Sequence, residues 1–464
     1  MVYESLLIGG SGGPPEDPVL PYTESSVRAK PGIVYSPESR ALQQSKNEIN
    51  LHYQEGKWDD YKKITNPYEY IFLSWNRRSS RSVATRQPLS RSYFKMVELW
   101  KIVGLTEFFA PMIGQGLRTA HAAEGPGGFI EACVRMTEKV GVPFQSAFAI
   151  TLRSDVKNIP GWRKATKFLE NNPQICIHDG ADGTGNILRK ENQDAFVQSV
   201  RTKHPEGVHL FTADGGFDFS NDYNAQEDSV FPLLLAETLL GLRVLAKGGC
   251  LIIKCFDTVE QPTLDLLWLY SRCFYEWYIV KPRTSRAGNA ERYIVGKGFL
   301  DSVHDVVDVF TQYQERGQFT NPILAHVKHK EHSKMMIQIA EIQEKIEHVE
   351  IAVIRETLDL IRSTEHSVVK RHVKANVLRS IEWCKEHEEE ISEGWVHELE
   401  KNVQREVTDL LQILNPATHS PTLSYTRPSV VSNVTFESFR SGVPTEVAPS
   451  ANPFMRIKGK FLGT

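Results

Sequence analysis

The sequence has few cysteines, no long hydrophobic run and no excess of either charge. Six cysteines occur among 464 residues, and no two of them form a Cys-x-x-Cys pair. This number is too small for a disulfide scaffold, so we expect reduced thiols in an intracellular protein. The spacing of the cysteines also predicts no zinc or other metal site. The most apolar stretch, residues 230–246, is interrupted by Pro232, Glu237 and Arg243, so no segment reaches the ~18 apolar residues of a membrane helix. The N-terminus also lacks the pattern of a secretory signal. We therefore expect a soluble protein with no membrane partner.

The charges nearly cancel. The 54 Lys and Arg residues face 57 Asp and Glu residues, which gives a net charge of −3 at pH 7. This balance excludes a highly basic, histone-like protein. It leaves room for a local basic groove, because net charge averages over all faces of a molecule.

Changes in composition divide the chain into four parts. Residues 1–65 form an N-terminal extension, in which residues 9–18 (GGSGGPPEDP) have the Gly and Pro content of a flexible leader. Residues 66–310 alternate apolar runs with helical segments, and residues 320–414 are helical in composition. Residues 415–464 are rich in Pro, Ser and Thr, which predicts an extended tail.

Seven short apolar runs predict a β-sheet. Most of them are far enough apart to hold a helix between them, which is typical of a mostly parallel sheet covered by helices on both faces. The loop between the last two runs is shorter and predicts an antiparallel hairpin at one end of the sheet. The runs cover residues 117–122, 144–152, 174–178, 208–213, 249–256, 275–281 and 292–295.

The helical region contains a row of apolar residues at steps of four and three. The row is shorter than three heptads, so we expect it to pack onto the preceding domain rather than to form a free coiled coil. Its members are Met335, Ile339, Ile342, Ile346, Val349 and Val353.

The most informative segment joins a predicted strand to a predicted helix through glycines. It reads TAHAAEGPGGFI from position 119 onward, with Gly125, Gly127 and Gly128 at the turn. Glycines there let the backbone approach a ligand closely, with a helix N-terminus behind it. The segment lacks the Lys-Ser/Thr of a Walker loop and the spacing of the dinucleotide fingerprint. A tight structural turn would also explain these glycines.

Three later segments place polar residues at or within predicted strands. FTADGGF ends a strand with Asp214 and two glycines. LIIKCF places Lys254 inside an apolar strand, where an unpaired charge is costly. KPRTSRAGNAERYIV places Glu291 at the start of a strand, after a basic loop that contains serine.

Together these motifs resemble those of the FtsJ/RrmJ-like RNA ribose 2′-O-methyltransferases. The resemblance is strongest to the eukaryotic and large-DNA-virus enzymes that methylate the first nucleotide of capped mRNA. SRSYFK, EGPGGF, ADGGF, IIKCF and SRAGNAERYIV occur in the family's order between about residues 66 and 299. The resemblance implies a domain at 66–310 of the α/β class, a Rossmann-like S-adenosylmethionine-dependent methyltransferase. Its sheet would be seven-stranded and mostly parallel with an antiparallel end strand, and the helical C-terminal region would follow. The implied cofactor is S-adenosylmethionine, and the implied reaction converts cap-0 to cap-1 mRNA.

The resemblance also implies which residues form the site. The family's catalytic tetrad corresponds to Lys95, Asp214, Lys254 and Glu291, although two ordinary buried ion pairs would also explain these four. Glu124 stands where the cap enzymes have a small residue, which leaves its role open. The implied cofactor-binding residues are Ser90, Ala123, Glu124, Gly125, Pro126, Gly127, Gly128, Phe129, Asp182, Gly183 and Asp214.

The implied reaction is a direct displacement, in which a ribose 2′-oxygen attacks the sulfonium methyl. A hydroxyl is a poor nucleophile and needs a nearby base and in-line placement. We expect Lys254 to be the base, because its apolar strand and the neighbouring Lys95 would lower its pKa toward neutrality. Asp214 and Glu291 would oppose that shift while orienting the ammonium. The four groups titrate as a coupled set, so positioning could matter more than proton removal.

A basic stretch precedes Lys95. Residues 77–95 contain six basic residues and no acidic one, which fits either a solvated loop or a surface that contacts phosphates. In view of the resemblance we favour RNA contact. The expected RNA-binding residues are Arg77, Arg78, Arg91, Arg283, Ser285 and Arg286. Candidates for stacking a base are Tyr68, Tyr70, Trp75 and Tyr93, each of which core packing explains more readily.

Two other functions remain open at the level of sequence. A 2′-O-methyltransferase for ribosomal or transfer RNA would share the tetrad, and a non-catalytic RNA-binding or structural protein could retain the fold. The C-terminal helices are a candidate surface for a protein partner or for self-association. A viral enzyme of this kind would be cytoplasmic and a cellular one nuclear.

Overall fold

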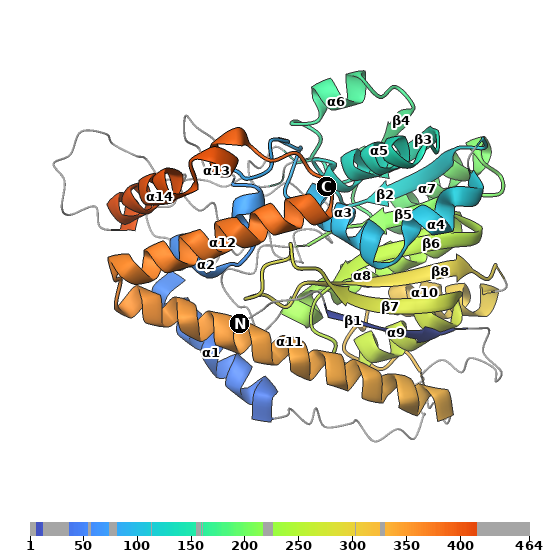
Figure 1. Ribbon diagram of the computed structural model, residues 1–464. Helices are drawn as coiled ribbons and strands as arrows, with labels where there is room; N and C mark the ends of the chain where they lie inside the picture. Colours follow the sequence, from blue (N-terminus) through green and yellow to red (C-terminus); the bar gives the residue numbers. More distant parts are fainter. Residues whose placement is uncertain are drawn as a thin grey trace, which may run out of the picture.

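An eight-stranded sheet forms the centre of the molecule (Figure 1), with the strand order β1-β7-β8-β6-β5-β2-β3-β4. The computed structural model describes residues 6–12, 37–53, 57–73, 81–112, 114–154, 159, 161–216, 226–301, 303–324 and 330–414. The strands are β1 (Leu6–Ser11), β2 (Leu117–Ala122), β3 (Phe144–Ile150), β4 (Ile175–His178), β5 (Val208–Ala213), β6 (Leu245–Cys255), β7 (Phe274–Lys281) and β8 (Arg292–Phe299).

The pairing of the strands confirms the expected α/β class. Strands β6, β5, β2, β3 and β4 are parallel to one another. Strand β8 is antiparallel to both β6 and β7, which confirms the expected hairpin. The sheet has eight strands rather than the expected seven. The additional strand, β1, is antiparallel to β7 and forms the end of the sheet, so that β7 is not an edge strand.

Strand β1 includes residues that the sequence predicted to be a flexible leader. Its backbone pairs with β7 along its whole length, and the Gly12 N–H donates to the Tyr275 carbonyl oxygen at 2.8 Å. The glycines here allow close packing, because a Cβ at Gly9 would lie 2.5 Å from the carbonyl oxygen of Trp277. The leader prediction is therefore wrong for residues 9–12. Residues 13–18 lie outside the described part of the chain.

Helices cover both faces of the sheet, and the alternation of side chains along each strand decides which face a residue joins. In β6, Leu251 and Ile253 belong to the hydrophobic cluster formed with the first layer of helices. Cys250 and Ile252 belong to the cluster of the second layer. Lys254 alternates with Ile253 and thus lies on the face of the second layer. The first layer comprises α7 (Lys190–Lys203), α8 (Gln226–Val244), α9 (Gln261–Arg272) and α10 (His304–Arg316), and the second comprises α3 (Ser92–Ile102), α4 (Leu105–Phe109) and α5 (Gly128–Val140).

The N-terminal and C-terminal helices lie together beside the sheet, although they are far apart in sequence (Figure 1). The apolar row of α11 packs as expected: Met335 to Ile346 join the cluster of the first helix layer. Farther along α11, Ile354 and Leu358 pack against Leu42 of α1. These helices are α1 (Pro37–Tyr53), α2 (Lys57–Thr65), α11 (Lys330–Arg362), α12 (His366–Glu386), α13 (Glu393–His397) and α14 (Leu399–Leu414).

Short helices complete the described structure, namely α6 (Thr166–Glu170) and the 3₁₀ segments η1 (Glu69–Ile71) and η2 (Ala110–Met112). Among the helices of the described residues, none is long and apolar enough to cross a membrane. All six cysteines are free thiols. The predicted tail, residues 415–464, lies outside the described residues.

Candidate active site

The glycine-rich turn joins β2 to α5 at the carboxyl end of the parallel strands. Gly127 has a φ of 106°, a conformation that favours glycine. A Cβ at Gly128 would lie 2.3 Å from the Ser90 hydroxyl oxygen, so the glycine lets the start of α3 approach the start of α5. The turn thus brings Ser90 beside the predicted cofactor loop. Phe129, the last residue of the predicted loop, is buried and packs on Tyr293 with ring centroids 5.7 Å apart.

The first pair of the predicted tetrad joins two neighbouring strands. Asp214 follows β5, and Lys254 lies near the end of β6. The Lys254 ammonium donates a hydrogen bond to the Asp214 carbonyl oxygen at 2.8 Å and lies 3.3 Å from the Asp214 carboxylate. The neighbouring Gly216 leaves space for this ammonium, because a Cβ there would lie 3.2 Å from it.

The second pair joins a helix to the start of β8. Lys95 of α3 donates a hydrogen bond to the Glu291 carboxylate at 2.8 Å. Tyr293 links the two pairs: its hydroxyl donates to the Asp214 carboxylate at 2.8 Å, and the Lys95 ammonium lies 6.0 Å from the centre of its ring. The structure therefore brings all four tetrad residues to one place.

Sequence reasoning missed Tyr293, and strand periodicity could have found it. Tyr293 lies two residues after Glu291, so both side chains project to the same face of β8. The ladder also places Tyr293 directly opposite Lys254.

The pKa of Lys254 is shifted in the direction opposite to the one expected. Burial lowers the pKa of Lys254, but the carboxylates of Asp214, Glu291 and Glu237 raise it above its ordinary value. The prediction of a pKa lowered toward neutrality is therefore wrong, because the surrounding acidic groups, Asp214 foremost, outweigh burial. Burial raises the pKa of Glu291, but Lys95 and Lys254 outweigh it and lower that pKa to about 2. At neutral pH the site thus contains a charged lysine beside a charged carboxylate.

Glu124 is buried beneath the turn rather than on its surface. Its carboxylate accepts a hydrogen bond from the Thr212 hydroxyl and lies 3.4 Å from His121 Nδ1. Burial raises the pKa of this carboxyl group. The Oε2 atom of Glu124 accepts no hydrogen bond from the described residues. The contacts with His121 and Thr212 explain how a large acid fits a position where a small residue was expected.

The turns after β2, β4 and β5 lie at the carboxyl end of the parallel strands, where ligands bind in open α/β sheets. After β4, Asp182 accepts hydrogen bonds from the backbone N–H and hydroxyl of Thr184 at 2.9 and 2.7 Å and pairs with Arg189. Gly183 adjoins it with a φ of 77° and open space around its Cα. Backbone amides at the glycine turn and carboxylates at Asp182 and Asp214 suit a ligand that carries an amine and sugar hydroxyls. These residues therefore fit S-adenosylmethionine.

Three of the arginines expected to bind RNA, Arg91, Arg283 and Arg286, have partners within the described part of the chain. Arg91 donates to backbone carbonyls of residues 68, 69 and 72, and Arg286 pairs with Glu69 at 3.0 Å. Arg283 pairs with Glu386 at 2.6 Å. The Ser285 hydroxyl is buried and donates to the Asn289 side chain at 3.2 Å. Arg91 and Arg286 thus bind the segment around η1, and Arg283 joins its loop to α12.

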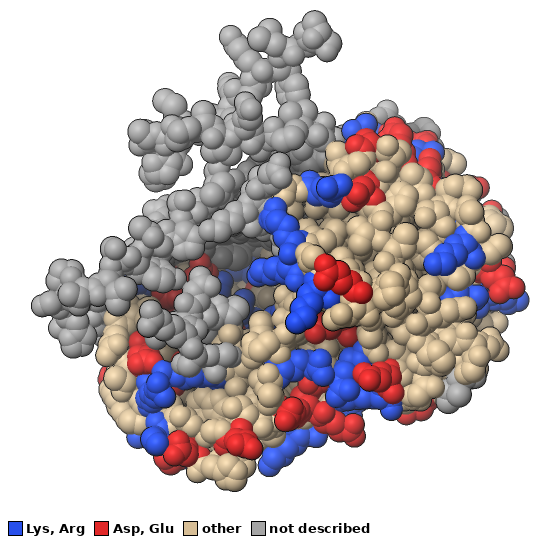
Figure 2. Space-filling view, turned by 90° about the horizontal axis from the view of Figure 1, so that it is seen from above, with Lys and Arg blue, Asp and Glu red and all other residues tan. Residues whose placement is uncertain are grey.

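The other residues expected to contact RNA either are buried in the core or lie outside the described part of the chain. Tyr68, Tyr70 and Tyr93 are buried core residues. Arg77, Arg78 and Trp75 lie outside the described part of the chain. On the face shown in Figure 2, Lys and Arg side chains are mixed with Asp and Glu side chains.

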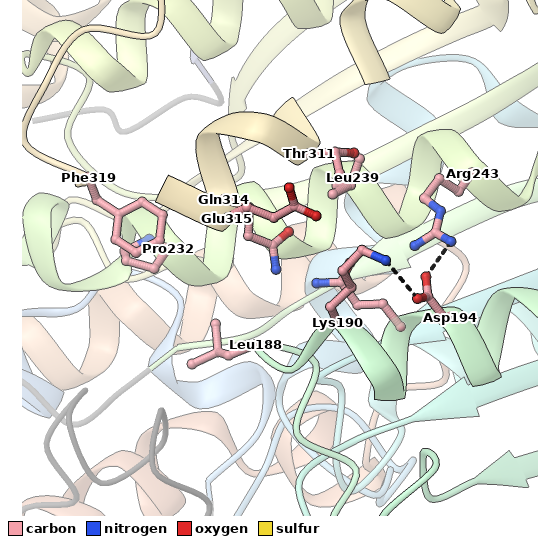
Figure 3. A pocket seen from close by; sticks show the side chains of 11 residues that line it. Leu188, Lys190, Asp194, Pro232, Leu239, Arg243, Thr311, Gln314, Glu315 and Phe319 are labelled. Carbon is pink, nitrogen blue, oxygen red and sulfur yellow. Dashed lines mark hydrogen bonds and ion pairs between the residues drawn. The ribbon is translucent and has the colours of Figure 1, made fainter. Parts of the chain in front are cut away.

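A separate cavity of about 280 Å³ lies between α7, α8 and α10 (Figure 3). Lys190 and Arg243 both pair there with Asp194, at 3.0 and 2.6 Å. No predicted site residue lines this cavity, so it is distinct from the tetrad.

Comparison with known proteins identifies the domain that contains this site. Residues 88–299 match the model of the FtsJ-like methyltransferase family. The cap-specific mRNA (nucleoside-2′-O-)-methyltransferase 1 of Bos taurus is 41% identical over 193 residues, which cover 41% of this chain and 22% of that protein. The protein of the same name from Dictyostelium discoideum is 32% identical over 255 residues, covering 52% of this chain and 31% of that protein.

The Trypanosoma brucei brucei protein of the same name is 30% identical over 236 residues, covering 50% of this chain and 61% of that protein. This chain thus spans less than two thirds of each of these relatives. The solved structure of a ribosomal RNA methyltransferase from Plasmodium falciparum is similar to 46% of this chain, over 98% of its own length, with 16% identity and a TM-score of 0.32. Residues 88–299 of this chain, which include all four tetrad residues, are thus similar in sequence to the FtsJ-like methyltransferase family.

Proposed function

We propose that the protein transfers a methyl group from S-adenosylmethionine to the ribose 2′-hydroxyl of the first nucleotide of capped mRNA. One observation carries the proposal: Lys95, Asp214, Lys254 and Glu291 converge beside a glycine-rich turn at the carboxyl end of the sheet. They come from four separate segments, and Tyr293 joins the two ion pairs into one cluster, which two independent structural ion pairs would not require. The names of the cap-specific relatives support capped mRNA as the substrate.

The cofactor would be held by the turn from Ala123 to Phe129, by Ser90, by Asp182 and Gly183, and by Asp214. When bound, S-adenosylmethionine supplies an electrophilic methyl group and a positive charge. A positive charge near Asp214 would offset the carboxylates around Lys254 and lower the pKa of this lysine. Lys254 can then accept the proton of the attacking hydroxyl, while Lys95 stays paired with Glu291.

The lysines also act without any change of protonation. Two ammonium groups near the 2′-oxygen stabilise the negative charge that develops on it as it attacks. Asp214 and Glu291 fix the direction of those ammoniums through the hydrogen bonds described above. Positioning and electrostatics therefore supply much of the catalysis, and proton removal completes it.

The test is transfer of labelled methyl from S-adenosylmethionine to two RNAs of the same sequence, one capped and one uncapped. Lys254→Ala is the control variant. Label on the capped RNA alone, lost in Lys254→Ala, is the expected result. Equal label on both RNAs would move the activity to internal RNA sites. An absence of label on either RNA, with cofactor binding intact, would favour a non-catalytic protein.

A further inference from the structure

The loop at residues 282–291 joins β7 to β8 and ends at the catalytic candidate Glu291. Two residues of opposite charge lie beneath it, and the proposed mechanism uses neither of them. Glu98 belongs to α3, and Lys281 is the last residue of β7. Both have an exposed fraction of 0%. Buried charges are costly unless they are paired and hydrogen-bonded, so the contacts of these two residues indicate what they do.

Glu98 holds the first part of the loop. One of its carboxylate oxygens accepts a hydrogen bond from the backbone N–H of Arg283 at 2.7 Å. The other oxygen accepts from the backbone N–H of Thr284 at 2.9 Å and from the Thr284 hydroxyl at 2.8 Å. Glu98 lies three residues after Lys95 on the same helix. One helix therefore carries a tetrad residue and holds the loop that carries another.

Lys281 holds the last part of the loop. Its ammonium donates hydrogen bonds to the carbonyl oxygens of Asn289 at 2.7 Å and Glu291 at 2.8 Å. It also contacts the side-chain oxygen of Asn289 at 3.1 Å and the Arg286 carbonyl oxygen at 3.4 Å. All four acceptors belong to the loop, and one of them is on the backbone of Glu291.

The C-terminal helices support the same loop from outside. The Trp383 indole N–H of α12 donates to the Glu98 carboxylate at 3.3 Å. Glu386 of α12 pairs with Arg283 at 2.6 Å. Val353 of α11 packs closely on the loop, because a Cβ added at Gly288 would lie 3.2 Å from the Val353 side chain. Helices α11 and α12 thus pack against the loop and against Glu98.

We propose that Glu98 and Lys281 are positioning residues that hold Glu291 in place against Lys95 and Lys254, and that α11 and α12 support them. The inference rests on the proposed methyl transfer for its catalytic consequence. A shift of about 1 Å in a catalytic group can cost roughly 100-fold in rate. Loss of either anchor therefore acts on the rate constant rather than on cofactor affinity.

Two variants remove the anchors one at a time. Glu98→Gln places an amide NH₂ against a backbone N–H, whichever way the amide turns, because both oxygens of Glu98 accept backbone hydrogen bonds. Lys281→Met keeps an unbranched side chain that is one atom shorter and removes every donor. Thr284→Ala is a milder variant that removes one hydroxyl bond to Glu98.

The matched control is Asp265→Asn. Asp265 of α9 is another fully buried carboxylate that accepts two backbone N–H groups, from Ile323 at 2.9 Å and Leu324 at 3.1 Å. That loop carries no predicted site residue. The control therefore measures the effect of losing a buried carboxylate that binds a loop unrelated to the site.

Two measurements on the full chain are needed. Hydrogen exchange of residues 282–291 is expected to speed up in Glu98→Gln and Lys281→Met, less in Thr284→Ala, and not in Asp265→Asn. The kcat for capped RNA is expected to fall roughly tenfold to 100-fold in the first two variants, with cofactor Kd changed by less than about twofold. Asp265→Asn is expected to keep the wild-type kcat.

The outcomes separate the inference from the proposed function. Unchanged exchange of residues 282–291 in the anchor variants would overturn the inference, as would a kcat no lower than in Asp265→Asn. If Glu98→Gln or Lys281→Met does not fold, Thr284→Ala decides by the same two measurements. A wild-type chain without methyl transfer would refute the proposed function, while hydrogen exchange would still decide whether the two anchors hold the loop.

Discussion

The pH dependence of methyl transfer tests the charge of Lys254. Carboxylates around this lysine raise its pKa above the ordinary value of 10.5, so the neutral base is a minor form of the free enzyme. At pH 7.5 the neutral fraction is below about one in 10³, since each pH unit below the pKa reduces it tenfold. If Lys254 must be neutral to accept the proton, kcat/KM should rise about tenfold per pH unit between pH 7 and 9, because kcat/KM follows the free enzyme.

The assay measures initial rates of labelled methyl transfer to capped RNA at low cofactor concentration and constant ionic strength. One other group near Glu291 titrates in this range, because burial lowers the pKa of Lys281 to about 7. The profile is therefore repeated with Lys281→Met. A plateau above pH 7 that persists in this variant would refute the charge assignment of Lys254. A flat profile would refute its role as the base.

Three further changes test other parts of the structure. Tyr293→Phe removes the hydroxyl that donates to Asp214 and should lower kcat about tenfold, with a loss of about 1 kcal/mol in the free energy of unfolding; an unchanged kcat in the methyl transfer assay would show that this hydrogen bond is dispensable. Burial raises the pKa of Glu227 to about 8, so the folded protein holds a proton there that the unfolded chain releases above its ordinary pKa of about 4.5. Stability should therefore fall as the pH rises through that window, and thermal melts at pH 5 and 8 should show a smaller fall for Glu227→Gln; an equal fall in both proteins would contradict this. Trp383→Ala should lower the free energy of unfolding by about 4 kcal/mol, because the side chain is fully buried. Tyr275→Ala, at a residue that is 62% exposed, should change the free energy of unfolding by less than about 0.5 kcal/mol. Denaturant unfolding of both variants measures these two changes.

Local patterns in the sequence predicted most of the sheet. Apolar runs and their spacing indicated β2 to β8, because a strand buried on both faces needs a short apolar run and a parallel neighbour needs a crossover helix. Strand β1 escaped this reasoning. Its residues Gly9, Gly10 and Ser11 are typical of a linker, and the reason for the glycines is the close approach of β7, which no local pattern shows.

The proximity of the four tetrad residues was predicted better than the charge state of the site. Motif order indicated Lys95, Asp214, Lys254 and Glu291, and the structure brings them together. The direction of the Lys254 pKa shift was wrong because it depends on which groups surround the ammonium. One of these is Glu237 of α8, which belongs to no motif and contributes to the shift through its place in the fold.

The expected RNA contacts show the same limit. The basic loop before Glu291 favours a free cationic surface, but Arg286 pairs with Glu69, 217 residues away in the sequence. Arg283 pairs with Glu386 of the helical region. Whether these arginines also contact phosphates stays a prediction, and RNA would have to compete with those carboxylates.

The sequence by itself determined the order of β2 to β8 along the chain and the glycine turn, and its resemblance to a known family indicated the four polar residues of the site. The strands and the turn depend on periodicity and on backbone freedom, which are properties of neighbouring residues. The tertiary structure alone decided the added edge strand, the charge state of Lys254, and the anchoring of the loop at 282–291 by Glu98 and Lys281. The reason is physical: edge pairing, burial and Coulomb interactions depend on groups that are close in space and distant in sequence.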